Sequence, residues 1–215
     1  MELSVQTFCA YYPAYKRHGE GWNSTKFCQA VKSGTVEGYF HLPLGQERIK
    51  VGGDNGRPFS FARTVYGGMI KRAVQTVGLN DIVYVPAPSK DSFGEPNFRS
   101  LRMLQTALGA DESRKVRPAL RFNTQLAPAS QGGSRGYNAT LPYLTCGVDI
   151  TGTKVVLVDD IITTGGTLLA CKAAIERAGG EVVLAVAAGR TDANEPNPFS
   201  SKVVSVEDFE FQDLF

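Results

Sequence analysis

Two strand patterns with a helix pattern between them constrain the fold of this chain more than any other feature. The first strand is "KVVLVDD" at 154–160, and the second is the nearly all-apolar "EVVLAVAAG" at 181–189, typical of a strand covered on both faces. Between them Leu168, Cys171 and Ile175 recur at helical spacing, and two glycines end the pattern. A strand–helix–strand unit of this kind predicts parallel strands joined by a crossover helix.

The same alternation continues on both sides of this unit. The expected elements are a helix over 62–77, a strand at 81–86 ("DIVYVP"), a helix over 98–108, a weaker strand at 116–122 ("VRPALRF") and a last strand at 201–209 ("SKVVSVEDF"). We therefore expect an α/β fold, with a parallel sheet and helices on both of its faces. In such sheets ligands bind beyond the carboxyl ends of the strands.

The first 60 residues differ from the rest and are rich in aromatic residues and glycine. Short strands are expected at "VEGYFHLPL" and "ERIKV", followed by the turn signal "GGDNG" at 52–56. We expect a small, β-rich N-terminal extension over 1–60, resembling a hood, and a core domain over 61–215. In the N-terminal extension, aromatic side chains either line a binding pocket or form a small core of that extension: Tyr11, Tyr12, Tyr15 and Trp22.

Composition excludes several classes of function. The 215 residues carry 23 Lys and Arg against 21 Asp and Glu, so the net charge of +2 gives no excess for nucleic-acid binding. No stretch approaches the roughly 18 apolar residues of a membrane span, and the N-terminus lacks a signal-peptide pattern. The four cysteines show no paired spacing, and His18 and His41 form no metal pattern with them. Free thiols in the cytoplasm are the expectation.

The stretch "VVLVDDIITTGGT" at 155–167 carries the most specific chemistry. The loop from Thr163 to Thr167 joins a strand to a helix, where free backbone N–H groups, hydroxyls and the helix N-terminus suit a phosphate. Asp159 and Asp160 are costly to bury without donors or cations, which ribose hydroxyls and Mg²⁺ supply. The pair alone would read as an acidic turn before a helix cap, but all thirteen residues favour a ribose 5-phosphate unit. The Gly-rich fingerprints of nucleoside triphosphate and dinucleotide sites are absent.

These thirteen residues resemble the motif of the type I phosphoribosyltransferases that binds 5-phosphoribosyl 1-diphosphate (PRPP). By that resemblance, which extends over about 61–190, Asp159 and Asp160 hold the ribose. The residues implied to hold the 5-phosphate are Thr163, Thr164, Gly165, Gly166 and Thr167. The protein itself is expected to supply no metal ligand, except that the two acids reach Mg²⁺ through the ribose or a water.

Two further segments resemble parts of the same family. "VYVPAPSK" is similar to the family's diphosphate-binding loop, which assigns the diphosphate to Ala87, Pro88, Ser89 and Lys90. The long stretch 122–149 stands where the family has a loop that closes over the site, and Arg135 is its best anion ligand. Lys90 and Arg135 are thus the candidate catalytic cations. The alternative interpretations are that Lys90 is a solvated lysine in a turn and that Arg135 is an ordinary surface arginine.

Within the family, the ComF-like proteins have the nearest pattern. Their run of arginine, threonine, glutamine, arginine and asparagine is similar to Arg121, Thr124, Gln125, Arg135 and Asn138, and "FRSLRMLQ" and "YGGMIKR" stand where those proteins have similar helices. Two departures separate the chain from them. It has no cysteine zinc ribbon, and its first 60 residues are unlike theirs.

The resemblance implies a phosphoribosyltransferase that joins PRPP, with Mg²⁺, to a nitrogen base that the sequence does not identify. Relatives that act on 6-oxopurines place an aspartate where this chain has Thr163, so an acceptor that arrives as an anion fits better. The resemblance also allows a homodimer. Two alternatives stay open: a PRPP-binding regulator without turnover, and an α/β domain that uses the two aspartates for a metal alone.

Overall fold

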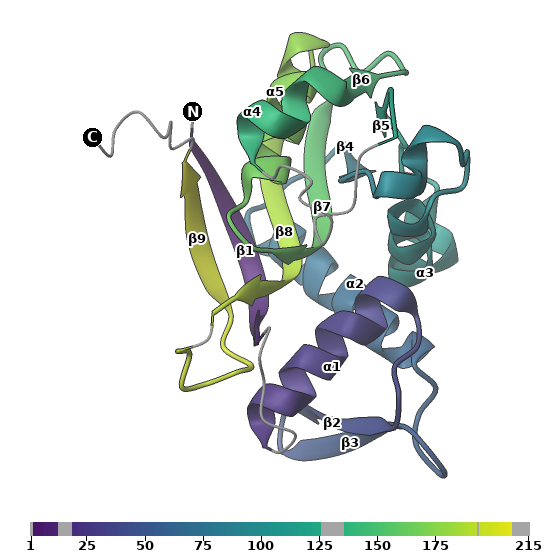
Figure 1. Cartoon of the computed structure of the whole chain (residues 1–215), viewed down its shortest axis with the longest axis vertical. Helices are drawn as coiled ribbons and strands as arrows, with labels where there is room; N and C mark the ends of the chain where they lie inside the picture. The colour runs from purple at the N-terminus through teal and green to yellow at the C-terminus, as the bar shows by residue number, and fades with distance from the viewer. Residues whose placement is uncertain (1, 13–18, 126–135, 193, 208–215) are drawn as a thin grey trace.

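A five-stranded sheet runs through the middle of the molecule in the order β4-β7-β8-β1-β9 (Figure 1). The computed structural model describes residues 2–12, 19–125, 136–192 and 194–207. The strands are β4 (Ile82–Pro86), β7 (Lys154–Ile162), β8 (Glu181–Thr191), β1 (Glu2–Tyr11) and β9 (Lys202–Glu207). All neighbours pair in parallel except β9, which runs antiparallel to β1. The expected α/β fold with a mostly parallel sheet is confirmed.

Helices cover both faces of this sheet (Figure 1). Helices α1 (Glu20–Ser33), α2 (Ser60–Thr76) and α3 (Arg99–Ser113) pack on one face, and α5 (Gly166–Arg177) packs on the other. Side chains of a strand alternate between faces, so Val156 and Val158 of β7 meet the first group, whereas Val155 and Leu157 meet α5. The helices expected over 62–77 and 98–108 correspond to α2 and α3.

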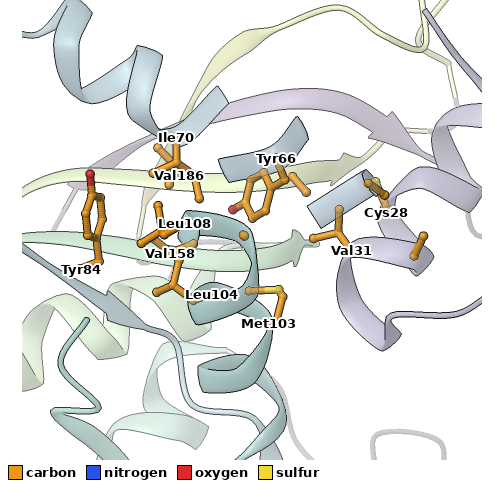
Figure 2. Close-up of a cluster of buried hydrophobic side chains, with 14 of the residues drawn as sticks. Cys28, Val31, Tyr66, Ile70, Tyr84, Met103, Leu104, Leu108, Val158 and Val186 are labelled. Carbon is orange, nitrogen blue, oxygen red and sulfur yellow. The ribbon is translucent and has the colours of Figure 1, made fainter. Parts of the chain in front are cut away.

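Close packing fixes α2 and α3 against the sheet. Figure 2 shows Tyr66 and Ile70 of α2 and Leu108 of α3 beside Val158 of β7, and all four are buried. The two helices approach so closely that a Cβ at Gly67 would lie 1.8 Å from the carbonyl oxygen of Ala107. Each such fully buried side chain contributes about 1.5–3 kcal/mol relative to its exposed state. The site beyond the strand ends therefore rests on a rigid base.

The expectation for residues 1–60 needs correction. Residues 2–11 do not lie in a separate extension but form β1, between β8 and β9 of the main sheet. Residues 20–33 form α1, whose buried face includes the polar Asn23, Ser24 and Thr25, so no apolar stripe marked it in the sequence. The two short strands expected here correspond to β2 (Tyr39–Leu44) and β3 (Glu47–Gly52), which pair antiparallel in a small sheet of their own. The boundary at residue 60 stays a prediction for the remainder.

The segment 122–149 is more ordered than the expected long loop where the structure describes it. Strand β5 (Leu120–Phe122) pairs antiparallel with β6 (Leu144–Cys146) in a small sheet of its own. Between them lie α4 (Tyr137–Thr140) and the 3₁₀ turn η3 (Leu141–Tyr143). Among the described residues, no helix combines the length and apolar character needed to cross a membrane.

Candidate functional site

A cleft of about 810 Å³ opens at the carboxyl ends of the parallel strands. It brings together the two stretches that the sequence had marked, one after β4 and one after β7, which pair as neighbours. Its third side comes from α1 and the residues that follow it. The lining from these three sources includes Pro88, Ser89 and Lys90; residues 159–168; and Gln29, Lys32, Ser33, Thr35 and Val36.

The loop between β7 and α5 has a shape that only glycine permits at two positions. Gly165 has a φ of 78°, and a Cβ there would lie 2.3 Å from the side chain of Val206 in β9. A Cβ at Gly166 would lie 2.5 Å from the Cα of Gly136, which is backbone and cannot rotate away. The loop is therefore pressed between β9 and the start of α4, with its remaining surface turned to the cleft.

The same loop presents hydrogen-bond donors without acceptors. No described residue accepts a hydrogen bond from the backbone N–H groups of Thr163, Thr164 and Gly165 or from the hydroxyls of Thr163, Thr164 and Thr167. Helix α5 begins at Gly166 and adds the partial positive charge of its N-terminus. Donors and dipole together suit a phosphate group, as the sequence predicted for this loop.

Asp159 and Asp160 extend toward opposite faces of β7. Asp160 is 5% exposed and faces α1 and α3, where its carboxylate lies 2.7 Å from Arg99 Nη1 and 3.4 Å from Lys32 Nζ. Asp159 is half-buried; its Oδ1 accepts a hydrogen bond of 2.7 Å from the backbone N–H of Asp160. The other oxygen of Asp159 accepts none from the described residues. The two adjacent acids therefore differ: Asp160 is paired with two cations, whereas Asp159 retains an oxygen that can accept a further hydrogen bond.

Burial raises the pKa of Asp159 to about 7, and the neighbouring carboxylate of Asp160 adds to the shift. The backbone of Asp159 is held from below by Tyr66, whose hydroxyl donates a hydrogen bond of 2.6 Å to the Asp159 carbonyl oxygen. Burial also raises the pKa of Tyr66 well above its ordinary value, so this hydroxyl remains a donor. Near neutral pH the free oxygen of Asp159 is thus poised between its protonated and charged forms.

The residues after β4 occupy different positions. Pro88, Ser89 and Lys90 line the cleft, whereas Ala87 is buried and its N–H donates to the carbonyl oxygen of Val158 at 2.8 Å. The Ser89 hydroxyl donates to the Asp91 carboxylate. Lys90, at the start of η1 (Lys90–Phe93), is exposed at the edge of the cleft. Of the four residues predicted to contact a diphosphate, Lys90 is the most exposed.

The expected closing loop at 122–149 contributes three described residues to the cleft. Phe122 comes from its start, and Gly136 and Thr140 come from its middle. Arg135 lies outside the described residues, so its assignment stays a prediction. Arg121 of the ComF-like pattern donates instead to the backbone oxygens of residues 95 and 96 and is not among the residues that line the cleft.

Sequence reasoning missed the side of the cleft that α1 forms. Gln29 and Lys32 come from this helix, and Arg99 from the start of α3, and none had been marked as a site residue. Of the aromatic residues left open, Tyr11 lines the cleft, whereas the Tyr12 hydroxyl donates to the backbone of Glu195. Trp22 packs beneath the ammonium of Lys26. Tyr15 lies outside the described residues.

The metal-ligating capacity of the described residues is small. They contain no group of three or more His, Cys, Asp and Glu side chains that would hold an ion, and all four cysteines are free thiols. Asp159 alone offers an oxygen without a partner here, since Asp160 already meets two cations. Such a donor set fits Mg²⁺ that keeps its waters and binds chiefly through substrate phosphates.

Comparison with known proteins agrees with this geometry. Residues 129–213 match the family model described as "Phosphoribosyl transferase domain", which includes the Asp159–Asp160 pair and the loop after it. The chain is 46% identical over 61 residues to adenine phosphoribosyltransferase of Corynebacterium efficiens, which covers 27% of this chain and 32% of the relative. It is 65% identical over 34 residues to orotate phosphoribosyltransferase of Methanopyrus kandleri, covering 16% and 19%.

A third relative is the hypoxanthine/guanine phosphoribosyltransferase of Methanocaldococcus vulcanius, 47% identical over 49 residues, which cover 23% of this chain and 26% of the relative. The chain thus spans a third or less of the length of these relatives. The chain is thus similar to phosphoribosyltransferases over the part that contains the Asp159–Asp160 pair and the loop after it.

Proposed function

We propose, with the phosphoribosyl transferase domain match as the premise, that this chain is a Mg²⁺-dependent phosphoribosyltransferase. It would transfer the phosphoribosyl group of PRPP to a nitrogen base and release diphosphate. One observation carries the proposal. The Asp159–Asp160 pair lies at the end of β7 directly beside a glycine-shaped loop of unpaired donors, and both face one cleft.

Substrate binding follows from the hydrogen-bonding capacity of these groups. The N–H groups and hydroxyls of 163–167 receive the 5-phosphate at the N-terminus of α5. The free oxygen of Asp159 accepts a ribose hydroxyl, and Asp160 offers the second acceptor when its long contact to Lys32 opens. Hydroxyl donors from the ribose favour the charged form of Asp159 and lower its pKa from the value near 7.

The reaction is a displacement at C1 of the ribose. The bond from C1 to the diphosphate oxygen breaks as the bond from the base nitrogen forms, and the electron pair leaves with the diphosphate. No side chain has to act as a nucleophile, so the protein contributes positioning and charge stabilisation. Lys90 at the cleft edge is placed to meet the leaving diphosphate, and Arg135 is its proposed partner from the closing segment.

Mg²⁺ bound with PRPP supplies charge neutralisation of the diphosphate, and Asp159 and Asp160 would hold it through the ribose or water. The side chains themselves orient the ribose and exclude water. Phe122 and Thr140 of segment 122–149 line the cleft, so closure of this segment would keep water from the cation-like sugar.

The acceptor is a base that reaches the site already deprotonated or anionic. The position four residues after Asp159 is Thr163, whose exposed hydroxyl is a poor general base. Similar proteins are an adenine, an orotate and a hypoxanthine/guanine phosphoribosyltransferase, so three acceptor classes enter the test. In its finer form, we propose an enzyme that is similar to the ComF-like proteins, lies in the cytoplasm and acts as a homodimer.

A PRPP-binding regulator without turnover is the second candidate. One observation favours it: Asp160 is already neutralised by Arg99 and Lys32, so the site is stable without substrate. Binding alone would then displace Lys32 and report the presence of PRPP. Measurement of turnover separates this candidate from the enzyme.

Calorimetric titration with PRPP·Mg²⁺ tests the binding step. We expect the wild type to bind and the Asp159→Asn/Asp160→Asn variant to lose about 100-fold or more in affinity, since two charge-assisted hydrogen-bond sites disappear. Asp54→Asn/Asp111→Asn is the matched control, because it removes the same charge from exposed residues that do not line the cleft. No binding by the wild type would overturn the proposal.

Diphosphate release with adenine, guanine, hypoxanthine and orotate then tests turnover. An enzyme of the proposed kind releases diphosphate with one of these bases and needs Mg²⁺ to do so. Tight PRPP binding without release, with any of them, favours the regulator. Rapid turnover of guanine would contradict the inference drawn from Thr163.

A further inference from the structure

Of the two described cations that meet Asp160 in the cleft, Lys32 is held more loosely than Arg99. It lies 3.4 Å from Asp160, its side chain is 45% exposed, and it contacts no other described residue. Ion pairs this long and this exposed contribute about 0–1 kcal/mol. Asp160 therefore gives little reason for a lysine at this position.

Arg99 already satisfies Asp160. Its guanidinium lies 2.7 Å from Asp160 Oδ2 and also donates to the carbonyl oxygen of Lys32, while its backbone N–H donates to Asp91 at 2.8 Å. This arginine thus joins α3, β7 and the end of α1, as a planar donor with several N–H groups can. Two cations facing one carboxylate leave one positive charge in excess beside the cleft.

The backbone beneath Lys32 is fixed even though its side chain is not. Arg63 of α2 donates to the carbonyl oxygens of Val31 and Lys32 at 2.9 and 3.2 Å, so these otherwise unpaired oxygens at the end of α1 are satisfied. Gly34 continues the chain in the left-handed conformation and donates to Ala30. The Lys32 side chain therefore extends into the cleft from a helix end whose backbone is held in place.

The surroundings of Lys32 suit a flat, polar ring. Tyr11, Val36 and Ile161 line the cleft with apolar surface. Gln29, one turn before Lys32 on α1, also lines it, and its amide makes no hydrogen bond to any described residue. An amide offers both a donor and an acceptor, which matches a ring edge that has a carbonyl next to an N–H.

We propose that Lys32 anchors an acidic substituent of the acceptor, and that the acceptor is a nitrogen heterocycle bearing a carboxylate. This inference rests on the proposed function and assigns its acceptor subsite to α1. Ribose hydroxyls take the Asp160 lone pair that Lys32 occupies, and the released ammonium turns to the acceptor. Lys32 and the phosphate-binding loop lie on opposite sides of β7, because α1 and α5 cover opposite faces, so the two ligand ends do not compete.

The charge of the cleft agrees with an anionic ligand. Among the described residues, the acidic and basic side chains of its lining are Lys32, Lys90, Arg99, Asp159 and Asp160. Apart from the two acids of the ribose site, every charged side chain of this described lining is a cation. On the α1 side the one described carboxylate, Asp160, faces two cations, Lys32 and Arg99, so an acidic heterocycle would meet a net positive charge there.

Two probe pairs test the subsite, because their members differ in the carboxylate: orotate with uracil, and nicotinate with nicotinamide. Each is titrated into wild type, Lys32→Met and Lys32→Arg, with and without ribose 5-phosphate. Arg102→Met is the matched control, since it removes a cation from α3 that does not line the cleft.

We expect the wild type to bind at least one carboxylate about tenfold or more tightly than its neutral partner, the effect of one charge-assisted hydrogen bond. Lys32→Met should lose that preference without changing the neutral probe, whereas Lys32→Arg and Arg102→Met should keep it. A wild type without any preference, or a preference that survives in Lys32→Met, would overturn the proposal.

PRPP·Mg²⁺ is titrated into the same variants to separate the two proposals. Affinity within about twofold of wild type in Lys32→Met supports an acceptor role, since the change is then specific to the second ligand. An equal loss for PRPP and for the carboxylate probe would mean that Lys32 only supports Asp160, and the inference fails. Absence of PRPP binding in the wild type counts against the proposed function, and the probe pairs still report on the anion subsite.

Discussion

The two sides of the cleft are built in different ways. The side formed by 159–167 is mostly backbone: its shape depends on Gly165 and Gly166, and its donors are N–H groups and short hydroxyls. The side formed by α1 and α3 consists of long side chains on rigid helix ends, chiefly Gln29, Lys32 and Arg99. A backbone site binds a group common to many ligands, whereas a side-chain site can change with single substitutions. Under the proposed function, the first side would bind the shared phosphoribosyl group and the second would select the acceptor.

The largest effect is expected at Gly166. In Gly166→Ala the new Cβ would lie 2.5 Å from the Cα of Gly136 and 2.7 Å from the backbone nitrogen of Tyr137, so the phosphate loop or α4 has to move. We expect a loss of about 100-fold or more in PRPP·Mg²⁺ affinity and about 1–3 kcal/mol in the free energy of unfolding. Calorimetry and urea unfolding measure the two effects.

Gly68→Ala is the control for this variant. Gly68 lies in α2, and a Cβ there meets nothing within 4 Å, so alanine should stabilise the helix by about 0.5–1 kcal/mol and leave PRPP affinity unchanged. If Gly166→Ala binds PRPP as the wild type does, the phosphate site does not depend on backbone shape and the contrast between the two sides is lost.

The next largest effect concerns Asp159 and pH. Because the pKa of Asp159 is raised to about 7, its charged form, which accepts the ribose hydroxyl, becomes populated only as pH rises through 7. PRPP affinity of the wild type should therefore increase about tenfold between pH 6 and 8. Asp159→Asn is titrated over the same pH range as a control. Its PRPP affinity should still follow the ionisation of the ligand's phosphates, but the tenfold rise caused by Asp159 should be absent.

The free energy of unfolding should decrease as pH rises, whereas PRPP affinity should increase. Between the ordinary pKa of 3.8 and the raised value of about 7, the folded protein holds a proton that the unfolded chain has released, so unfolding becomes easier as pH rises. Since Asp159 is only half-buried, we expect Asp159→Asn to exceed the wild type by about 1–2 kcal/mol at pH 8 and to equal it near pH 4. Denaturant unfolding at both pH values checks this, and equal stability at pH 8 would argue against a strained carboxylate.

The same contrast explains what the sequence could predict. The phosphate-loop side was predictable because its chemistry lies in one contiguous stretch, and the apolar strands before and after it set the parallel sheet. Lys32 and Arg99 are 67 positions apart, and only the packing of α1 and α3 brings them to Asp160. Helix α1 was missed because its buried face contains polar residues. Strand β1 was missed although Leu3 and Val5 alternate with Ser4 and Gln6 as in a strand, because its partners β8 and β9 lie far away in the sequence.

Arg99 tests the side-chain half of the comparison at a smaller scale. In Arg99→Met, buried Asp160 loses its 2.7 Å ion pair and retains the hydrogen bond from the Ile161 N–H and the long contact to Lys32. The Lys32 carbonyl oxygen at the end of α1 also loses one of its two arginine donors. We expect a loss of about 1–3 kcal/mol in stability and about tenfold in PRPP affinity. Arg102→Met, one turn along α3, should change neither by a measurable amount. Arg99→Lys should retain only part of the stability and PRPP affinity that Arg99→Met loses, because an ammonium cannot replace the planar guanidinium that bridges two acceptors.

The smallest effect is expected below the ribose site, at Tyr66. Its hydroxyl is the donor that holds the Asp159 carbonyl oxygen at 2.6 Å, and the ring is fully buried between the helices and the sheet (Figure 2). Tyr66→Phe keeps the ring and removes one hydrogen bond, so the cost should be about 1 kcal/mol in stability and a few-fold in PRPP affinity. Tyr84→Phe is the control, because its hydroxyl donates to the Glu112 carboxylate and neither residue lines the cleft. If both variants lower PRPP affinity equally, the effect is general loosening; a loss confined to Tyr66→Phe shows that the backbone side of the cleft is held in place from within the core.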